Sequence, residues 1–184
     1  MVDVTRLALE EVVEIVPRRF RDERGFFTET YNRDRLQAEG IDLAFVQDNV
    51  SWSARAGVVR GLHYQLPPRA QDKLVTVLRG AIFDVAVDIR KSSPRFGQWV
   101  GAELSAERGN QLLIPKGFAH AFMTLTDDVL VLYKTTDTYA QPLERSIRFD
   151  DPALGIAWPA VPEGYQLSDK DRAAPPLAEA EVFA

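Results

Sequence analysis

The sequence contains two histidines, His63 and His120, and the imidazole ring of each could assist proton transfer. They occur in the segments RGLHYQ and PKGFAHAF, at or beside the ends of apolar runs. A neutral imidazole accepts a proton near physiological pH, so either residue could serve as a general base. The structural alternative for both is a packed, hydrogen-bonded histidine in the core of a β protein.

A metal site is another possible use of the two histidines. Double-stranded β-helix proteins often bind iron or manganese through an HxH pair, a Glu and a later His, and the sequence has no HxH pair. Arg60 and Lys73 flank His63 in sequence, and their charge opposes a cation. The chain also has no cysteine, which excludes thiolate metal sites, disulfides and cysteine nucleophiles. We therefore expect no metal.

The elements that must position the histidines are predicted to be β-strands. Large apolar residues take every second position from Phe83 to Arg90, as in a strand with one face in a core. Residues 73–79, KLVTVLR, form a second such run, and Gly80 suits a tight turn, so the two runs predict a hairpin. Clusters of Gly, Pro, Asn and Asp separate further runs at 58–65, 111–114, 120–125 and 129–135. The fold class predicted is all-β, a sandwich or barrel.

Helix signals are few and short. Asn32 can cap a helix over RDRLQAE that ends at Gly40, and Ser168 with Asp171 resembles a capping box. Pro175 and Pro176 limit the second helix. The tail beyond Leu177 is predicted to be loosely held.

Length and charge restrict the class of protein further. The 184 residues predict a single domain over 1–184. The net charge of −5 and the dispersed basic residues argue against a nucleic-acid partner. No stretch approaches about 18 continuous apolar residues, and the amino terminus lacks a signal pattern, so we expect a cytoplasmic protein without a membrane association.

Several separated segments together resemble the dTDP-4-dehydrorhamnose 3,5-epimerase family. The similarity runs from about residue 4 to residue 177, and the matching segments occur in the family's order. They are FRDERGFFTE (20–29), QDNVSWSARAGVVRGLHYQ (47–65), KLVTVLRGAIFDVAVDIRKSSPRFGQW (73–99), IPKGFAHAF (114–122), YKTTDTY (133–139) and LSDKD (167–171). The resemblance implies a cupin-type jelly roll, a double-stranded β-helix, with a few short helices.

The chemistry of this family is proton exchange beside a ketone. In a dTDP-linked 4-keto-6-deoxy sugar, C3 and C5 both neighbour the C4 ketone, so removing either proton gives an enolate with its charge mainly on the C4 oxygen. Reprotonation from the opposite face inverts the carbon. The reaction needs a base, an acid on the other side and a donor at the oxyanion. No electron leaves the sugar, so no cofactor is required.

The resemblance assigns catalytic roles to four residues and a substrate contact to a fifth, His120. His63 is the base, Asp171 orients its ring, Tyr133 is the opposite-face acid, Lys73 stabilises the C4 oxygen, and His120 is a second donor to the sugar or the enolate. Each has a structural alternative. Asp171 could simply pair with the Ser168 cap, Tyr133 could be a core tyrosine with its hydroxyl at the rim, and Lys73 an ordinary strand-start lysine.

Substrate binding and assembly are also implied by the resemblance. Arg24, Arg60 and Lys170 would hold the diphosphate, and Tyr139 would stack on thymine with Phe26 or Phe27 as a neighbour. Further polar contacts are expected from Glu29, Gln47, Asn49 and Glu144. Family members form homodimers in which the RGFF segment crosses to the partner, so Arg24 and Glu29 are expected to serve the partner's site. We expect a homodimer in dTDP-rhamnose biosynthesis.

Some features depart from the family or leave alternatives. After Glu144 the family has a glycine and then a tryptophan, whereas this chain has the run 145–149, RSIRF. Asp48 and Asp72 place acids beside expected anion-binding positions, and strand alternation would turn them away. The alternatives are an epimerase of C3 alone or C5 alone, a metal-dependent cupin, and a sugar-binding jelly roll without turnover.

Overall fold

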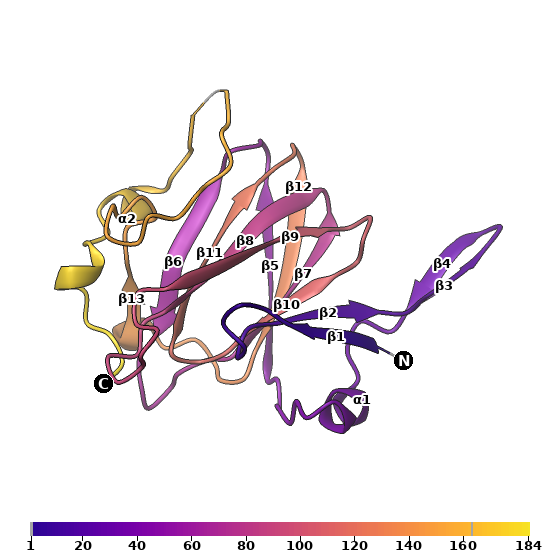
Figure 1. Ribbon diagram of the computed structural model, residues 1–184. Helices are drawn as coiled ribbons and strands as arrows, with labels where there is room; N and C mark the ends of the chain where they lie inside the picture. Colours follow the sequence, from indigo (N-terminus) through magenta and orange to yellow (C-terminus); the bar gives the residue numbers. More distant parts are fainter. Residues whose placement is uncertain (1, 163) are drawn as a thin grey trace.

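The computed structural model describes residues 2–162 and 164–184, and its centre is formed by two antiparallel sheets that face each other (Figure 1). The six-stranded sheet has the order β1 (Val2–Arg6), β2 (Val13–Pro17), β10 (Gln111–Ile114), β7 (Lys73–Arg79), β12 (Val129–Thr135) and β5 (Gln47–Ser53). The five-stranded sheet has the order β13 (Glu144–Ser146), β6 (Val59–Gln65), β11 (Phe118–Thr124), β8 (Ala81–Asp88) and β9 (Trp99–Ser105). The prediction of an all-β chain is confirmed.

The predicted hairpin of residues 73–90 is wrong, although both of its strands exist. Strand β7 pairs with β10 and β12 in one sheet, and β8 pairs with β11 and β9 in the other. Gly80, at φ +77°, turns the chain from one sheet into the facing one rather than into a neighbouring strand. A period-two pattern identifies a strand but carries no information about its partner, and here both partners come from later in the chain.

Strand β8 is buried on both faces, whereas the alternation of its apolar residues predicted a single face in a core. Val85, Val87 and Ile89 form a core with the segments that cover the outer face of the five-stranded sheet. Ile82 and Ala86 point the other way, into the core between the two sheets. Asp84 has the same alternation as Ile82 and Ala86 and is fully buried. The less apolar face of the strand is therefore the one that looks into the sandwich.

Both helix caps lie where the sequence predicts them. Helix α1 (Arg33–Ala38) begins after Asn32, whose side chain accepts a hydrogen bond from the Arg35 N–H. Helix α2 (Asp169–Arg172) begins after Ser168, which accepts one from the Asp171 N–H. Two short 3-10 turns, η1 (Gln141–Leu143) and η2 (Leu177–Glu179), complete the helical content of the described residues.

The C-terminal tail is packed, so the expectation that it is loosely held is wrong. The side chains of Leu177, Val182 and Phe183 join the core on the outer face of the five-stranded sheet. The Tyr64 hydroxyl donates to the Glu181 carbonyl at 2.6 Å, and the Lys91 N–H donates to the Phe183 carbonyl at 2.9 Å. Strand β8 requires this cover because its outward side chains are apolar.

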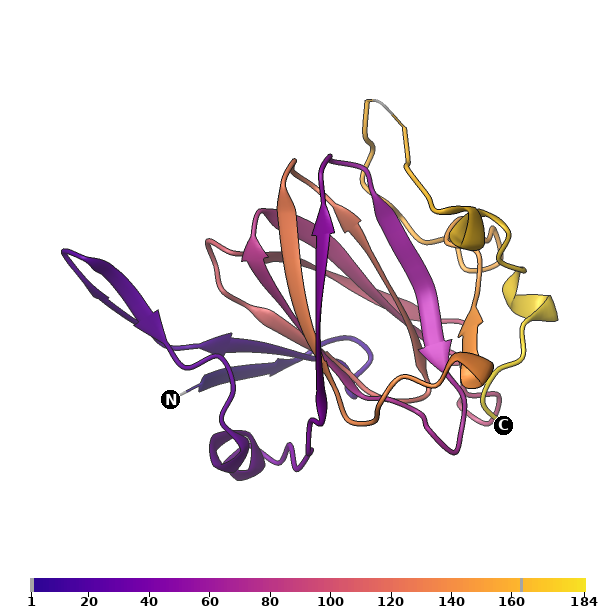
Figure 2. The same ribbon diagram turned by 180° about the vertical axis from the view of Figure 1, so that it is seen from behind.

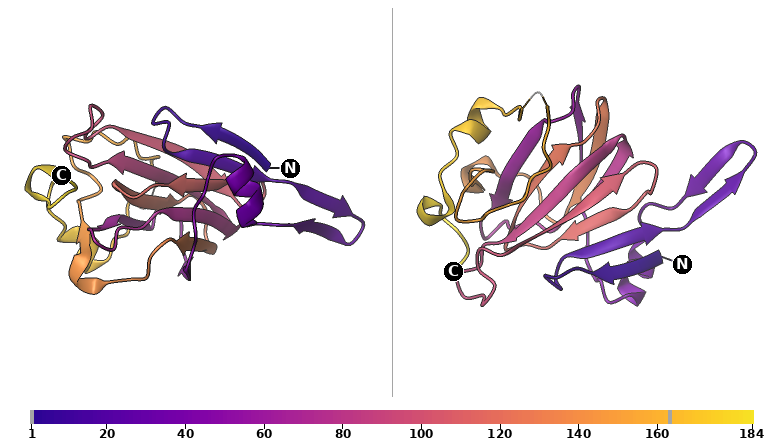
Figure 3. Two further views of the ribbon diagram at one scale, coloured as in Figure 1. Left: turned by 90° about the horizontal axis from the view of Figure 1, so that it is seen from below. Right: turned by 45° about the horizontal axis from the view of Figure 1, so that its top comes forward.

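A separate hairpin of β3 (Arg19–Asp22) and β4 (Gly25–Thr28) projects from the sandwich (Figure 2). It lies at the end of the molecule opposite the C-terminal segments (Figure 3). Its aromatic side chains Phe20, Phe26 and Phe27 are exposed. An isolated two-stranded hairpin is marginally stable in water, so a projecting one with exposed aromatic rings is a surface suited to a partner.

Across residues 2–162 and 164–184, no helix is long and apolar enough to cross a membrane. The same residues contain no group of three or more His, Cys, Asp or Glu side chains arranged to hold a metal ion.

Candidate active site

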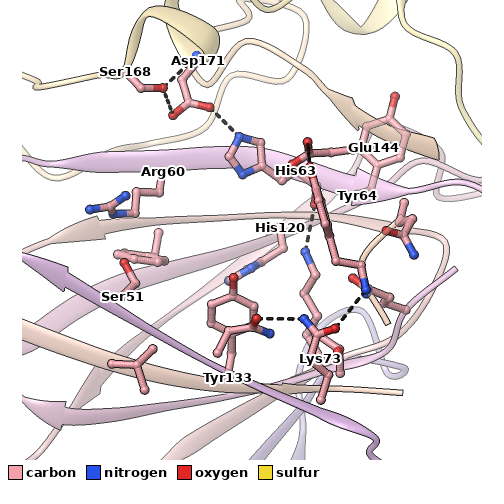
Figure 4. Close-up of a pocket in the computed structure, with 18 of the residues that line it drawn as sticks. Ser51, Arg60, His63, Tyr64, Lys73, His120, Tyr133, Glu144, Ser168 and Asp171 are labelled. Carbon is pink, nitrogen blue, oxygen red and sulfur yellow. Dashed lines mark hydrogen bonds and ion pairs between the residues drawn. The ribbon is translucent and has the colours of Figure 1, made fainter. Parts of the chain in front are cut away.

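A pocket of about 560 Å³ lies between the two sheets, lined by strands from both (Figure 4). The six-stranded sheet contributes residues of β5, β7 and β12, and the five-stranded sheet contributes residues of β6, β11 and β13. Ten of the site residues expected from sequence line it: Gln47, Asn49, Arg60, His63, Lys73, His120, Tyr133, Tyr139, Glu144 and Asp171.

The two histidines lie opposite each other on neighbouring strands. His63 of β6 pairs in register with His120 of β11, next to a register shift between His120 and Phe122. Gly61 allows the two strands to approach this closely. A Cβ on Gly61 would lie 2.5 Å from the His120 carbonyl oxygen, and its φ of +123° disfavours any other residue. The glycine of the GLH segment thus has a packing role beside the chemical one of the histidine.

His63 is held by a carboxylate that comes from far along the chain. Its Nε2 lies 2.5 Å from the Asp171 Oδ1, which α2 brings to the end of β6 across 108 positions. Asp171 is buried; burial works to raise its pKa, but the hydrogen bonds from His63 and Ser168 outweigh burial and the pKa is lowered. The carboxylate therefore stays ionised and accepts the Nε2 proton. Whenever the imidazole is in its neutral form, this contact leaves the lone pair on Nδ1, as a general base requires.

His120 has its own carboxylate, Asp84, which the sequence reasoning missed. The His120 Nε2 lies 2.5 Å from the Asp84 Oδ1, and both side chains are buried. Burial lowers the pKa of His120, with Asp84 acting in the opposite direction, so the ring is neutral at pH 7. The sequence signal for this pair was an aspartate, Asp84, among the apolar residues of the strand FDVAVD.

The tautomer of His120 affects its predicted role as a donor. If an ionised Asp84 accepts the Nε2 proton, the neutral ring presents Nδ1 to the pocket as an acceptor. It can then bind a sugar hydroxyl, whereas donating to an enolate oxygen requires the imidazolium. In that tautomer His120 fits the expected contact to the sugar.

Lys73 and Tyr133 approach the same space from the six-stranded sheet. The Lys73 Nζ lies 3.3 Å from the His63 carbonyl oxygen, beside the base. Burial lowers the pKa of Lys73 to about 8, against the raising effects of Asp84 and Glu144. Burial also raises the pKa of Tyr133, so its phenol keeps the proton at neutral pH. In Figure 4 the side chains of Tyr133 and Lys73 rise toward the histidines from the other side of the pocket.

One rim of the pocket is a chain of polar contacts between Tyr139, Glu144 and Lys170. The Tyr139 hydroxyl donates to the Glu144 Oε2 at 2.8 Å, and the Lys170 Nζ lies 2.6 Å from the same oxygen. Lys170 is therefore paired with Glu144, and it would have to break this ion pair to contact a diphosphate. Gln47 joins this rim because its Oε1 accepts from the Tyr139 N–H at 3.0 Å, and its Nε2 donates to Asn49 at 2.8 Å.

Arg60 and Ser51 lie together at the other side of the view in Figure 4. The Arg60 guanidinium donates to the Trp52 carbonyl at 3.0 Å and to the Ser53 hydroxyl at 3.3 Å. Ser51 lines the pocket, and its buried hydroxyl has no hydrogen-bond partner among the described residues. Sequence reasoning missed Ser51, although the alternation of Gln47, Asn49 and Ser51 along β5 would have put it on their face.

Three expected binding residues lie away from this pocket. Arg24 and Phe27 belong to the projecting hairpin, where the Arg24 side chain is 83% exposed and its Nη2 is paired with Asp22 at 2.5 Å. Phe27 is 69% exposed. Glu29 follows the hairpin and pairs with Arg35 at 3.1 Å. One chain alone therefore does not bring these residues to the histidines.

Asp48 and Asp72, the two acids beside expected anion-binding positions, turn away from the pocket, as strand alternation predicts. Asp48 pairs with Lys134 at 2.8 Å on the outer face of the six-stranded sheet. Asp72 is buried and accepts hydrogen bonds from the Thr136 hydroxyl and the Lys116 N–H. The departure after Glu144 is also accommodated, because Arg145 points to the tail and pairs with Glu181 at 2.7 Å.

A histidine beside a buried carboxylate, a protonated phenol from the facing sheet and an adjacent lysine are groups suited to moving protons at carbon, and on a cupin-type jelly roll they indicate an isomerase. The chain belongs to the dTDP-4-dehydrorhamnose 3,5-epimerase family, which its residues 6–179 match.

Individual relatives agree over nearly the whole chain. A dTDP-4-dehydrorhamnose 3,5-epimerase of Pseudomonas aeruginosa is 52% identical over 180 residues, covering 97% of this chain and 98% of the relative. The crystal structure of dTDP-6-deoxy-D-glucose-3,5-epimerase from Legionella pneumophila, in complex with dTDP-4-keto-L-rhamnose, superposes with a TM-score of 0.93 at 48% identity. That match covers 97% of this chain and 94% of the other.

A relative with a narrower activity shares the fold as well. The structure of a 3'-monoepimerase from Streptomyces bikiniensis, in complex with dTDP-quinovose, has a TM-score of 0.86 at 40% identity. It covers 94% of this chain and 86% of the other chain. Similarity of fold therefore extends to proteins named for inversion at a single carbon.

Proposed function

We propose that this protein converts dTDP-4-dehydro-6-deoxy-D-glucose to dTDP-4-dehydro-L-rhamnose by inverting C3 and C5. The observation that supports the proposal is that His63, beside Asp171, lies on one side of the pocket and Tyr133 on the facing side, as a base and an opposite-face acid would have to. Inversion requires removal of a proton from one face of the sugar and delivery to the other. The agreement with named 3,5-epimerases across nearly the whole chain supports the substrate.

The bonds made and broken follow from this geometry. The His63 Nδ1 takes the proton from C3 or C5, and the C–H electron pair becomes the double bond to C4 while the carbonyl pair moves onto oxygen. The Lys73 ammonium stabilises that oxyanion in a buried site. The Tyr133 hydroxyl then protonates the carbon from the opposite face. The sugar gains and loses no electrons, so the reaction needs no redox cofactor.

Nucleotide binding is assigned to the residues around the pocket. Tyr139 is half exposed at the rim, where its ring can stack on the base, and Gln47, Asn49 and Glu144 offer amide and carboxylate contacts. Arg60 and Lys170 supply positive charge for the diphosphate. Lys170 reaches it by exchanging its ion pair with Glu144 for one with phosphate.

We also propose that the protein is a homodimer in which the projecting hairpin completes the partner's pocket. Arg24, Phe27 and Glu29 are displaced from their own chain's site, and the hairpin exposes its aromatic rings to solvent. A second copy would cover those rings and bring the Arg24 guanidinium to a bound diphosphate.

Mixing two inactive variants tests this assembly. A His63→Ala chain and an Arg24→Ala chain each lack one required group. If Arg24 acts across the dimer, a heterodimer has one complete site, so mixing after mild denaturation and refolding restores up to about a quarter of wild-type activity in a statistical mixture. Arg33→Ala, an exposed arginine paired with Asp42 away from the hairpin, is the control and should remain active alone. No recovery on mixing would contradict the shared site.

The reaction itself is tested by incubating dTDP-4-keto-6-deoxyglucose with the metal-free protein in deuterated water. Mass spectrometry and NMR should find deuterium at both C3 and C5, and a downstream reductase should trap a rhamnose-type sugar. The second candidate, a single-centre epimerase, is favoured by the likeness to the Streptomyces bikiniensis 3'-monoepimerase and predicts label at one carbon. Absence of label with every 4-keto nucleotide sugar would refute both, and would favour a metal-dependent cupin or a sugar-binding protein.

A further inference from the structure

Ser168 contacts the carboxylate behind the base at two points. Its hydroxyl donates to the Asp171 Oδ2 at 2.8 Å, and its Oγ accepts the Asp171 N–H at 3.1 Å. The other carboxylate oxygen, Oδ1, accepts from the His63 Nε2 at 2.5 Å. Figure 4 shows the three side chains in a continuous row from α2 to the pocket. The sequence pattern explains Ser168 as a helix cap, but a cap requires only the bond from the N–H.

The hydrogen bond to Oδ2 has a consequence that capping does not. A carboxylate held at one oxygen can rotate about its side-chain torsion, whereas one held at both oxygens has a fixed direction. Asp171 is 4% exposed, so water has little access to replace a lost partner. Losing the Ser168 bond would leave a buried, charged oxygen unsatisfied, and the carboxylate would turn to find another donor.

We propose that Ser168 is a positioning residue for catalysis, acting through Asp171 to fix the ring and tautomer of His63. This inference rests on the proposed function, in which His63 is the base. Ser168 does not touch the reacting carbon. It holds the Asp171 carboxylate in the orientation that keeps the Nε2 proton on the far side of the ring and Nδ1 free for the substrate.

The first test compares two substitutions at position 168. Ser168→Ala should lower kcat for deuterium incorporation about tenfold, the size expected for a lost hydrogen bond to a charged group, and change KM by less than about twofold. Ser168→Thr keeps the hydroxyl and should restore kcat to near the wild-type value. Asn32→Ala removes the matching cap of α1 and should leave kcat unchanged. A drop in kcat for Asn32→Ala equal to that for Ser168→Ala would overturn the proposal.

A double-mutant cycle separates positioning from general stability. If Ser168 acts through Asp171, then Ser168→Ala should cause no further loss of kcat in an Asp171→Ala background. An independent structural contribution would instead multiply, giving the same tenfold loss in both backgrounds. Multiplicative losses would therefore refute the route through Asp171.

Proton NMR of the unliganded protein provides a test that does not require turnover. The proton between the His63 Nε2 and the Asp171 Oδ1 should give a low-field resonance in the wild type and in Ser168→Thr, and it should broaden or move in Ser168→Ala. A resonance unchanged in Ser168→Ala overturns the positioning role. A wild type that shows this behaviour but exchanges no 4-keto sugar would refute the proposed function alone.

Discussion

Lys73 should set the alkaline limit of activity, because in the proposed mechanism its ammonium stabilises the developing C4 oxyanion. Burial lowers its pKa from 10.5 to about 8. The lysine is then about nine tenths charged at pH 7 and about one tenth charged at pH 9. Since kcat/KM reports the free enzyme, it should fall about tenfold per pH unit above pH 8. Tyr133 does not account for that limb, because burial raises its pKa above the ordinary value of 10.0.

Two substitutions separate charge from position. Lys73→Arg keeps a cation whose pKa exceeds about 12, so the limb near pH 8 should disappear from the profile, whatever the remaining rate. Lys73→Met removes the oxyanion donor and should cost about 10²–10³ in kcat. The assay is direct NMR detection of deuterium uptake from pH 6 to 10, which avoids the pH dependence of a coupling enzyme.

The same pKa shift makes a prediction about stability, with a defined sign. The folded-state pKa of Lys73 lies below the unfolded value of 10.5, so between pH 8 and 10.5 the unfolded chain binds more protons and stability rises with pH. At pH 7 the buried charge costs about 3 kcal/mol of unfolding free energy, and Lys73→Met should recover a part of it. Urea unfolding measures the difference.

An alkaline fall in kcat/KM that remains near pH 8 in Lys73→Arg would belong to another group. That result would contradict the role of the Lys73 charge. A Lys73→Met protein that is less stable than the wild type would also contradict it, because the ammonium would then be a net stabilising group.

Other substitutions test the remaining parts of the site. His63→Ala should abolish deuterium exchange at C3 and C5 while dTDP affinity by calorimetry stays within about twofold, and wild-type turnover would remove His63 from the mechanism. Tyr133→Phe should reduce inversion more than exchange, and equal losses would count against an opposite-face acid. Gly61→Ala should cost about 2–4 kcal/mol in urea unfolding and lower kcat, because its Cβ would lie 2.5 Å from the His120 carbonyl oxygen; an unchanged midpoint would contradict the close-approach explanation.

Local features of this protein could be predicted from its sequence because local physics controls them. Apolar runs bounded by turn residues located β7 and β12 to the residue, and side-chain capping located α1 and α2 after Asn32 and Ser168. The scarcity of histidine directed attention to His63 and His120, and the separated family segments predicted the pocket residues on β5, β6 and β7. The strand and cap signals each span fewer than about ten residues, the range over which backbone geometry and side-chain direction are set by neighbours.

Pairings across the sandwich were decided by the tertiary structure alone. The strand pattern could not reveal that β7 and β8 belong to different sheets, that Asp84 meets His120, or that the tail covers β8. Nor could it decide whether Asp171 only pairs with the Ser168 cap or also meets His63. In the folded chain one carboxylate oxygen accepts from the Ser168 hydroxyl and the other lies 2.5 Å from the His63 Nε2. Such contacts join residues 36 to 108 positions apart in the sequence. A local sequence pattern describes the strand or helix in which each residue lies, but it does not state which distant residue will contact it.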